Sequence, residues 1–256
     1  MNSALTKTEA DCPDAETLQG MREDLAATFR YFVRLGMNES VANHFSLAVS
    51  PDGRQFLMNP RGRHFSRVRA SDLQLIDADD HATMTRENAP DPTAWYIHSR
   101  IHRSLPHARC ILHLHPRYAT ALSALADSSL PPIDQNTMRF FGRVAIDEGF
   151  EGMGLSEEEG DRLARQMGNK SVLMMGNHGV LIAAPTVAQA MDEMYYFEKA
   201  CETVLIAYAS GRPLRIVPDH VAETTAQQWA EYVQLGIDHL SEVRAILDSE
   251  EPDYCC

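Results

Sequence analysis

The sequence predicts a single α/β domain, and three observations support this prediction. The chain has 256 residues, of which 44% are hydrophobic, and this is enough for one large core. Alternating apolar runs typical of strands are interspersed with apolar residues at steps of three and four, which are typical of helices. No internal repeat or low-complexity segment divides the chain, so strands and helices are expected to share one domain over residues 15–215.

Apolar periodicity and turn residues define the elements of the first half. Gly36 ends the first periodic run, and Pro51-Asp52-Gly53 separates two short alternating runs, which is typical of a β-hairpin. The expected elements are a disordered lead-in over 1–14, a helix over 15–35, hairpin strands over 44–49 and 55–58, a strand over 72–77, a loop over 78–92 and a helix over 93–105.

The second half follows the same rules. Pro116 ends a short apolar strand, Ser156 followed by three glutamates is typical of a helix start, and Gly211 ends the longest helix. The expected elements are a strand over 110–115, a helix over 118–126, loop and strand over 127–155, a helix over 156–167, strands over 171–175 and 180–183 around a tight turn, a helix over 186–210, and a C-terminal extension over 216–256 with one or two helices and a flexible tail.

Composition excludes several classes of protein. The formal net charge of −13 repels phosphate backbones and anionic lipid, so neither nucleic acid nor membrane is an expected partner. The N-terminus lacks the basic start and apolar run of a secretory signal. Of five cysteines, Cys110 and Cys201 lie in apolar segments and none forms a Cys-x-x-Cys pair, which indicates a reducing compartment and a cytoplasmic protein. For Cys255 and Cys256, a loose tail is favoured over metal binding or modification.

Three histidines form a candidate metal site. His113 and His115 lie at positions i and i+2 of a predicted strand, so both imidazoles should project to the same side. His178 lies in a glycine-flanked turn between two predicted strands, from which it can reach a neighbouring strand end. Three neutral imidazoles suit a divalent metal, with zinc expected and iron, manganese, cobalt or nickel as alternatives. The competing interpretation is a pair of ordinary hydrogen-bonded strand histidines.

The histidine motifs also carry a family resemblance. The segment Cys110-Ile-Leu-His-Leu-His-Pro116, followed by Gly176-Asn-His-Gly-Val-Leu181, resembles the class II aldolase and adducin family. The resemblance covers about residues 20–210 and includes Ala42-Asn-His-Phe-Ser46, Phe56-Leu-Met-Asn-Pro60 and Ile101-His-Arg103. It implies a three-layer α/β/α sandwich around a largely antiparallel sheet, a homo-oligomer that is commonly a tetramer, and metal-dependent aldehyde-lyase or related chemistry with His113, His115 and His178 as ligands.

The sequence departs from the family pattern in two places. Ala94 stands where the aldolases have a glutamate that transfers protons, one helical turn before the position matched by His98. The phosphate-binding Ser-Gly-Asn turn corresponds to Ala42-Asn43-His44, and the Ser-Ser pair corresponds to Pro92-Thr93. A phosphate cradle needs glycine for close approach of backbone N–H groups, so a non-phosphorylated substrate is expected.

Histidines and one loop region provide the remaining candidate residues. His98 and His44 are the candidate catalytic bases, because imidazole titrates near neutral pH; the competing interpretation for each is a histidine satisfied by a backbone carbonyl. Asn43 is a candidate substrate-binding residue. Gln135, Asn136 and Arg139, with Arg143 nearby, are candidates to bind a substrate carboxylate.

These observations support three hypotheses. The first is a metal-dependent lyase that acts on a small oxygenated, carboxylated, non-phosphorylated substrate by retro-aldol cleavage or decarboxylation. The second is a non-catalytic, adducin-like binding or assembly module, which the missing glutamate favours. The third is a non-haem Fe(II) oxygenase on the same scaffold, because three histidines with open coordination positions also suit iron and oxygen.

Overall fold

A mixed seven-stranded sheet lies at the centre of the computed structural model, which describes residues 13–149 and 152–256. The strand order is β3-β2-β1-β4-β7-β6-β5. Adjacent strands pair antiparallel except β5 and β6, which are parallel. The strands are β1 (His44–Ala48), β2 (Gln55–Met58), β3 (Gln74–Asp77), β4 (Cys110–Leu114), β5 (Val144–Asp147), β6 (Val172–Met175) and β7 (Gly179–Ala184). The largely antiparallel sheet that the resemblance implied is confirmed.

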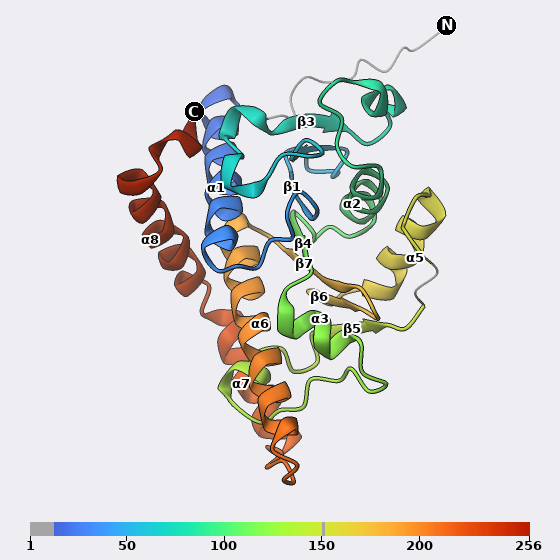
Figure 1. Ribbon diagram of the computed structural model, residues 1–256, viewed down its shortest axis with the longest axis vertical. Helices are drawn as coiled ribbons and strands as arrows, with labels where there is room; N and C mark the ends of the chain where they lie inside the picture. Colours follow the sequence, from blue (N-terminus) through green and yellow to red (C-terminus); the bar gives the residue numbers. More distant parts are fainter. Residues whose placement is uncertain (1–12, 150–151) are drawn as a thin grey trace, which may run out of the picture.

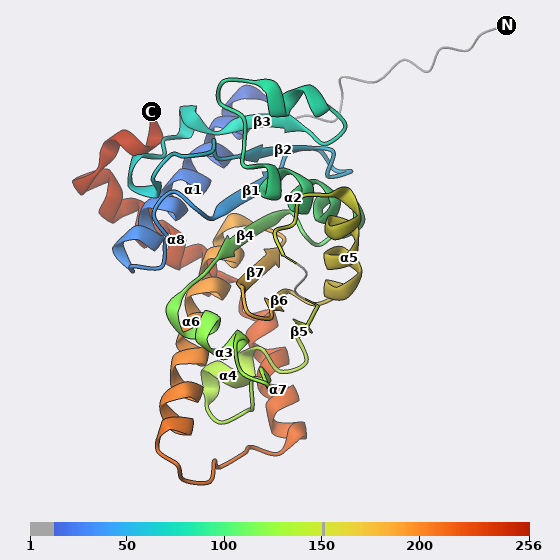
Figure 2. The ribbon, with the colours of Figure 1, turned by 45° about the vertical axis from the view of Figure 1, so that its right-hand side comes forward.

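Helices cover both faces of this sheet. Figures 1 and 2 show α1, α6 and α8 on one side of the sheet and α2 and α5 on the other. The α-helices are α1 (Ala15–Arg34), α2 (Pro92–Ser104), α3 (Arg117–Ser123), α4 (Gln135–Arg139), α5 (Glu157–Met167), α6 (Val187–Ala209), α7 (Asp219–Glu231) and α8 (Gln234–Glu250). The predicted three-layer α/β/α sandwich is therefore confirmed. None of the helices in the described part of the chain is both long and apolar enough to cross a bilayer.

Alternation along β4 divides the interior into two layers. Leu112 and Leu114 pack with apolar residues of α1 and α6, whereas Ile111 packs with Ile101 of α2 and Leu163 of α5. Successive strand residues point to opposite faces, so the same alternation places His113 on the α2 and α5 side. The alternation of side chains along β4 therefore determines both the two apolar layers and the face of the sheet on which the candidate metal site lies.

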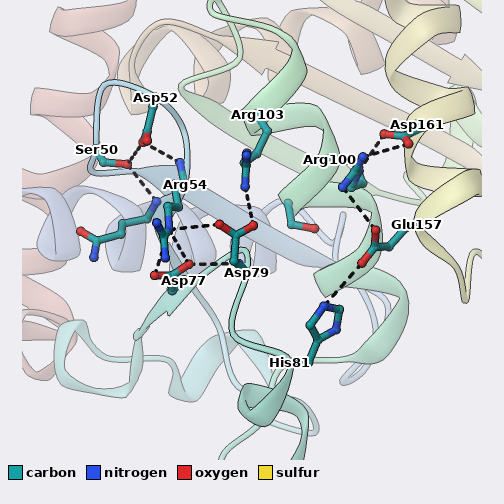
Figure 3. Close-up of polar contacts among 12 residues, drawn as sticks. Ser50, Asp52, Arg54, Asp77, Asp79, His81, Arg100, Arg103, Glu157 and Asp161 are labelled. Carbon is teal, nitrogen blue, oxygen red and sulfur yellow. Dashed lines mark hydrogen bonds and ion pairs between the residues drawn. The ribbon is translucent and has the colours of Figure 1, made fainter. Parts of the chain in front are cut away.

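Salt bridges fix α2 and α5 relative to each other (Figure 3). Arg100 of α2 binds Asp161 of α5 through two hydrogen bonds of 2.7 and 2.9 Å and also contacts Glu157 at 3.3 Å. Gly160 allows the close approach, because a Cβ at this position would lie 2.5 Å from the carbonyl oxygen of Tyr96. These contacts hold the helix that carries His98 over the face of the sheet where His113 lies.

Two regions differ from the sequence prediction. Residues 135–139, expected as loop and strand, form the short helix α4, whose N-cap Asp134 accepts a hydrogen bond from the backbone of Thr137 at 2.8 Å. The expected flexible tail instead forms the 3-10 helix η5 (Pro252–Cys255), because Tyr254 is fully buried and the Cys256 carbonyl accepts a hydrogen bond from the Ser71 amide. Of the lead-in over residues 1–14, all but the last two residues lie outside the described part of the chain.

Candidate metal site and adjoining cavity

Three histidine side chains converge at one edge of the central sheet. His113 lies in β4, His115 directly follows this strand, and His178 lies in the turn between β6 and β7. The ring centroids are 4.8 Å apart for His113 and His115, 4.8 Å for His113 and His178, and 4.7 Å for His115 and His178. One ligand nitrogen from each ring lies within 4.8 Å of the others, so the three residues predicted from the sequence do come together.

The β6–β7 turn brings His178 to this position through unusual backbone geometry. Asn177 adopts a left-handed conformation with φ of 55°, which asparagine tolerates better than most residues. The amide of Gly176 donates a hydrogen bond of 2.7 Å to the carbonyl of Asp147. A Cβ on Gly179 would lie 2.6 Å from Cδ2 of His115, so only glycine leaves room for that ring. Both glycines of the motif therefore have a steric role.

In the neutral form of each ring, the hydrogen bonds of His113 and His115 leave Nε2 unprotonated. Nδ1 of His113 donates to the carbonyl of Val180 at 3.1 Å, and Nδ1 of His115 donates to the carboxylate of Glu39. The two Nε2 atoms consequently face each other as lone pairs at 3.0 Å. Two opposed acceptors repel each other unless a cation lies between them, and metal-bound histidines typically donate their other nitrogen to a carbonyl or carboxylate. The donor set fits a divalent metal.

Burial keeps His113 and His178 neutral. It holds the pKa of His113 well below its usual range and, together with the nearby His115, lowers the pKa of His178 to about 4. Neutral imidazole is the form that binds metals. His113 and His178 are thus in their metal-binding protonation state at neutral pH.

A cavity of about 310 Å³ opens beside the histidine cluster. Its walls combine apolar side chains with several polar and charged groups that can orient a small molecule. Besides the three histidines and the glycines at 152 and 154, the cavity is lined by Val41, Ala42, Asn43, His44, Asn59, Arg61, Asp91, Thr93, Ile97 and Met153.

The two candidate bases occupy different places. His44 lines the cavity, and its ring centroid lies 4.8 Å from that of His113. His98 is fully buried behind it and is not part of the cavity wall; its Nε2 lies 2.7 Å from Nδ1 of His44. His98 would therefore act on a substrate in this cavity only through His44. Burial lowers the pKa of His44 to about 3, so this side chain is neutral.

The candidate carboxylate-binding residues Gln135, Asn136 and Arg139 lie on α4 and do not line this cavity. Arg139 is buried, forms an ion pair with Asp192 of α6, and stacks against the ring of Tyr196. A sequence motif alone could not distinguish an internal ion pair from a substrate-binding arginine. The substrate-binding role of these three residues stays a prediction, whereas the candidate Asn43 lines the cavity.

The sequence prediction missed three polar residues at the site. Arg61 and Asp91 line the cavity, and Glu39 binds His115. Arg61 lies in the turn after β2, Asp91 caps α2, and Glu39 lies in the loop before β1. Each lies in a connection with no periodic pattern, so only the folded chain brings it near the histidines.

Comparisons with known proteins agree with this architecture. Residues 23–205 match the family described as the Class II Aldolase and Adducin N-terminal domain. The chain is 29% identical to "Decarboxylase NovR" from Streptomyces niveus, over 89% of this chain and 84% of that protein. It is 28% identical to "4-hydroxy-3-prenylphenylpyruvate oxygenase/4-hydroxy-3-prenylbenzoate synthase" from Streptomyces roseochromogenus subsp. oscitans, over 89% and 82%. A crystal structure of an aldolase II superfamily protein from Pseudomonas syringae superposes with a TM-score of 0.83 at 30% identity, covering 95% of this chain and 98% of that one. The chain therefore belongs to the class II aldolase and adducin family.

Proposed function

We propose that the protein is a metal-dependent lyase that breaks a carbon–carbon bond in a small carboxylated, non-phosphorylated substrate by retro-aldol cleavage or decarboxylation. The observation that carries this proposal is the convergence of His113, His115 and His178, in which the Nε2 atoms of His113 and His115 lie 3.0 Å apart. The relative named as a decarboxylase supports the same class of reaction. A divalent metal, for which zinc is our proposal, would act as a Lewis acid that stabilises negative charge on a substrate oxygen.

Arg61 is the proposed partner of the substrate carboxylate. It is an exposed cation on the cavity wall, and within the described residues its guanidinium forms no hydrogen bond or ion pair. Arginine binds carboxylates through two parallel hydrogen bonds. Asn43 supports substrate binding as well, because its buried Nδ2 has no partner among the residues that the structure describes, while its Oδ1 accepts a hydrogen bond from the Glu39 amide at 3.1 Å. A buried donor without a partner is rare and suggests a ligand oxygen.

The remaining cavity wall favours a substrate with an apolar part. Val41, Ile97 and Met153 line the cavity, and the side chain of Met153 is largely exposed. Asn43, at φ of 74°, carries a side chain where a phosphate cradle would need close backbone approach. An oxygenated acid that carries a hydrocarbon or aromatic group fits these walls better than a sugar phosphate does.

His44 is the proposed group for proton transfer. Ala94 is buried among apolar residues including Trp95, so α2 provides no carboxylate at the position of the family glutamate. His44 lies on the cavity wall next to His113 as a neutral imidazole, so it is placed to accept a proton from a bound substrate, although burial, which lowers its pKa to about 3, makes it a weak base in the protein without ligand.

An Fe(II) oxygenase is the second candidate, because three histidines also suit iron and one relative is named an oxygenase. Metal analysis of the purified protein and turnover with and without oxygen separate the two candidates. The lyase releases an aldehyde or carbon dioxide without consuming oxygen, whereas the oxygenase requires oxygen for every turnover. Metal-free, folded protein without turnover in either assay would favour the adducin-like binding module.

Single variants test the site itself in a screen of hydroxy and oxo acids. We expect His113→Ala to abolish metal binding and turnover, and His220→Ala, which alters an exposed histidine on α7, to change neither. Arg61→Ala should raise KM about 10- to 100-fold, because a hydrogen-bonded charge contributes roughly 1.5–3 kcal/mol. Equal turnover of the wild type and His113→Ala would refute the assignment.

We further propose that the chain forms a homo-oligomer. Its described surface exposes large apolar side chains on the C-terminal part of the chain, including Ile206, Ile216 and Ile237. Contact between subunits would remove such side chains from water, which is favourable. Light scattering on the purified protein would give the size of the assembly, and a monomer at all concentrations would refute this proposal.

A further inference from the structure

We propose that a buried chain of hydrogen bonds, which starts at the carbonyl of Ala108 and runs through His102, Ser46 and His98, sets the tautomer of His44 and leaves its Nε2 unprotonated toward the cavity. His102, Ser46 and His98 are then positioning residues. The function assigned to His44 rests on the proposed lyase activity, whereas its tautomer can be measured without any activity.

The fold brings these side chains together through two simple periodicities. His44 and Ser46 lie at i and i+2 of β1 and thus on one face of the sheet, and His98 and His102 lie at i and i+4 of α2 and thus on one face of the helix. α2 covers this face of the sheet (Figures 1 and 2). His44 is also the direct cross-strand partner of His113, so the chain of contacts ends beside the candidate metal site.

Every link in the chain has the length of a hydrogen bond. Nδ1 of His102 lies 2.7 Å from the carbonyl oxygen of Ala108, and Nε2 of His102 lies 2.7 Å from Oγ of Ser46. Oγ of Ser46 lies 2.6 Å from Nδ1 of His98, and Nε2 of His98 lies 2.7 Å from Nδ1 of His44. All four side chains are at most 7% exposed, so water competes little for these contacts.

The carbonyl of Ala108 fixes the direction of all the bonds because it can only accept. His102 is neutral, since burial lowers its pKa to about 3, so its single N–H is on Nδ1 and its Nε2 is an acceptor. The hydroxyl of Ser46 therefore donates to His102 and accepts from Nδ1–H of His98. Nε2 of His98 then accepts from Nδ1–H of His44, whose own Nε2 has a lone pair.

The opposite direction is excluded by the same acceptor. A proton on Nε2 of His44 would require the proton of His98 on Nε2, the hydroxyl of Ser46 pointing at His98, and the proton of His102 on Nε2. Nδ1 of His102 would then oppose the Ala108 carbonyl with a lone pair at 2.7 Å. Buried acceptors facing each other without a proton are unfavourable. The Ala108 carbonyl therefore determines which ring nitrogen of His44 is protonated, although four hydrogen bonds separate the two groups.

The consequence concerns proton transfer in the cavity. Nδ1 of His44 points at the buried His98, so Nε2 is the nitrogen available to a ligand in the cavity that His44 lines. An unprotonated nitrogen there can take a proton from a substrate, and the hydrogen-bond chain keeps the ring in one orientation. If His44 could exchange tautomers freely, its Nε2 would carry the proton for part of the time and would then donate to a ligand in the cavity instead of accepting from it.

Nitrogen-15 NMR of histidine-labelled protein tests this directly. Solid-state spectra of the sedimented, full-length, zinc-loaded protein distinguish protonated from unprotonated ring nitrogens, and single-histidine variants assign the signals. We expect His44, His98 and His102 all to carry their proton on Nδ1, the tautomer that neutral imidazole disfavours in water. A proton on Nε2 of His44 in the wild type would overturn the proposal.

Ser46→Ala interrupts the chain at its centre. We expect a mixture of tautomers at His44 and a decrease in kcat in proportion to the lost fraction of the Nε2-unprotonated form, about twofold when the two tautomers are equally populated, at unchanged KM and zinc content. Ser46→Thr keeps the hydroxyl and should restore the wild-type spectrum. Ser99→Ala is the matched control, because this buried serine of α2 bonds only to the carbonyl of Tyr96, at 3.3 Å.

The outcomes separate the two proposals. An unchanged His44 spectrum in Ser46→Ala, in protein with wild-type circular dichroism, would overturn the hydrogen-bond chain even if the enzyme is a lyase. The expected spectral change in a protein that turns over no substrate would support the chain and refute the proposed function.

Discussion

Gly179→Ala should damage the histidine cluster without removing any ligand. The added Cβ would lie 2.6 Å from Cδ2 of His115 and 2.6 Å from the carbonyl oxygen of Leu114. Ordinary contacts are about 3.5–4 Å, so these atoms must separate by about 1 Å. The Leu114 oxygen belongs to the backbone of β4, which is held by β1 and β7 on both sides, so the ring of His115 has to move.

Overpacking of this kind costs about 1–3 kcal/mol of the free energy of unfolding. A displaced ligand should also weaken zinc binding by about 10- to 100-fold, the range seen when the groups that orient metal ligands are changed. Urea unfolding of the zinc-free protein measures the first effect, and a competition titration with a zinc chelator measures the second.

Gly20→Ala is the matched control. No atom of the described part of the chain lies within 4 Å of a Cβ at Gly20, which is inside α1, so this substitution should stabilise the protein by about 0.5–1 kcal/mol and leave zinc affinity unchanged. Wild-type zinc affinity and stability in Gly179→Ala would refute the steric role assigned to this glycine.

Two further predictions concern buried charge. Asp192→Asn should lower the free energy of unfolding by about 3–5 kcal/mol, because it leaves the buried Arg139 without its counter-ion and weakens the contact with His239 of α8. Urea titrations measure this effect, and a loss below about 1 kcal/mol would contradict the prediction. Burial lowers the pKa of His102 to about 3 from about 6.5 in the unfolded chain, so between these values the unfolded state binds a proton that the folded state does not. The free energy of unfolding should therefore fall as the pH decreases below about 6.5. In His102→Gln, the dependence of this free energy on pH should be weaker by about 1.4 kcal/mol per pH unit, and an equal pH dependence in both proteins would refute the prediction.

Much of the scaffold could be predicted from local patterns. The helix over 15–35 and the hairpin strands were predictable because apolar periodicity and glycine stops act within one element. The i, i+2 spacing of His113 and His115 likewise predicted that both side chains project from the same face of the sheet. The short helix α4 was missed because its five residues depend on the Asp134 cap and on packing against α6 and α7.

By itself, the sequence determined most of the strands and helices, though not α4, and it singled out the three histidines able to hold a metal, since these depend on residue spacing and motifs within short segments. Only the tertiary structure decided that Arg61 faces the cavity while Arg139 is an internal ion pair, and that His98 lies behind His44. The physical reason is that hydrogen bonds and ion pairs join residues far apart in the chain, and their partners are set by strand register and helix packing rather than by local sequence.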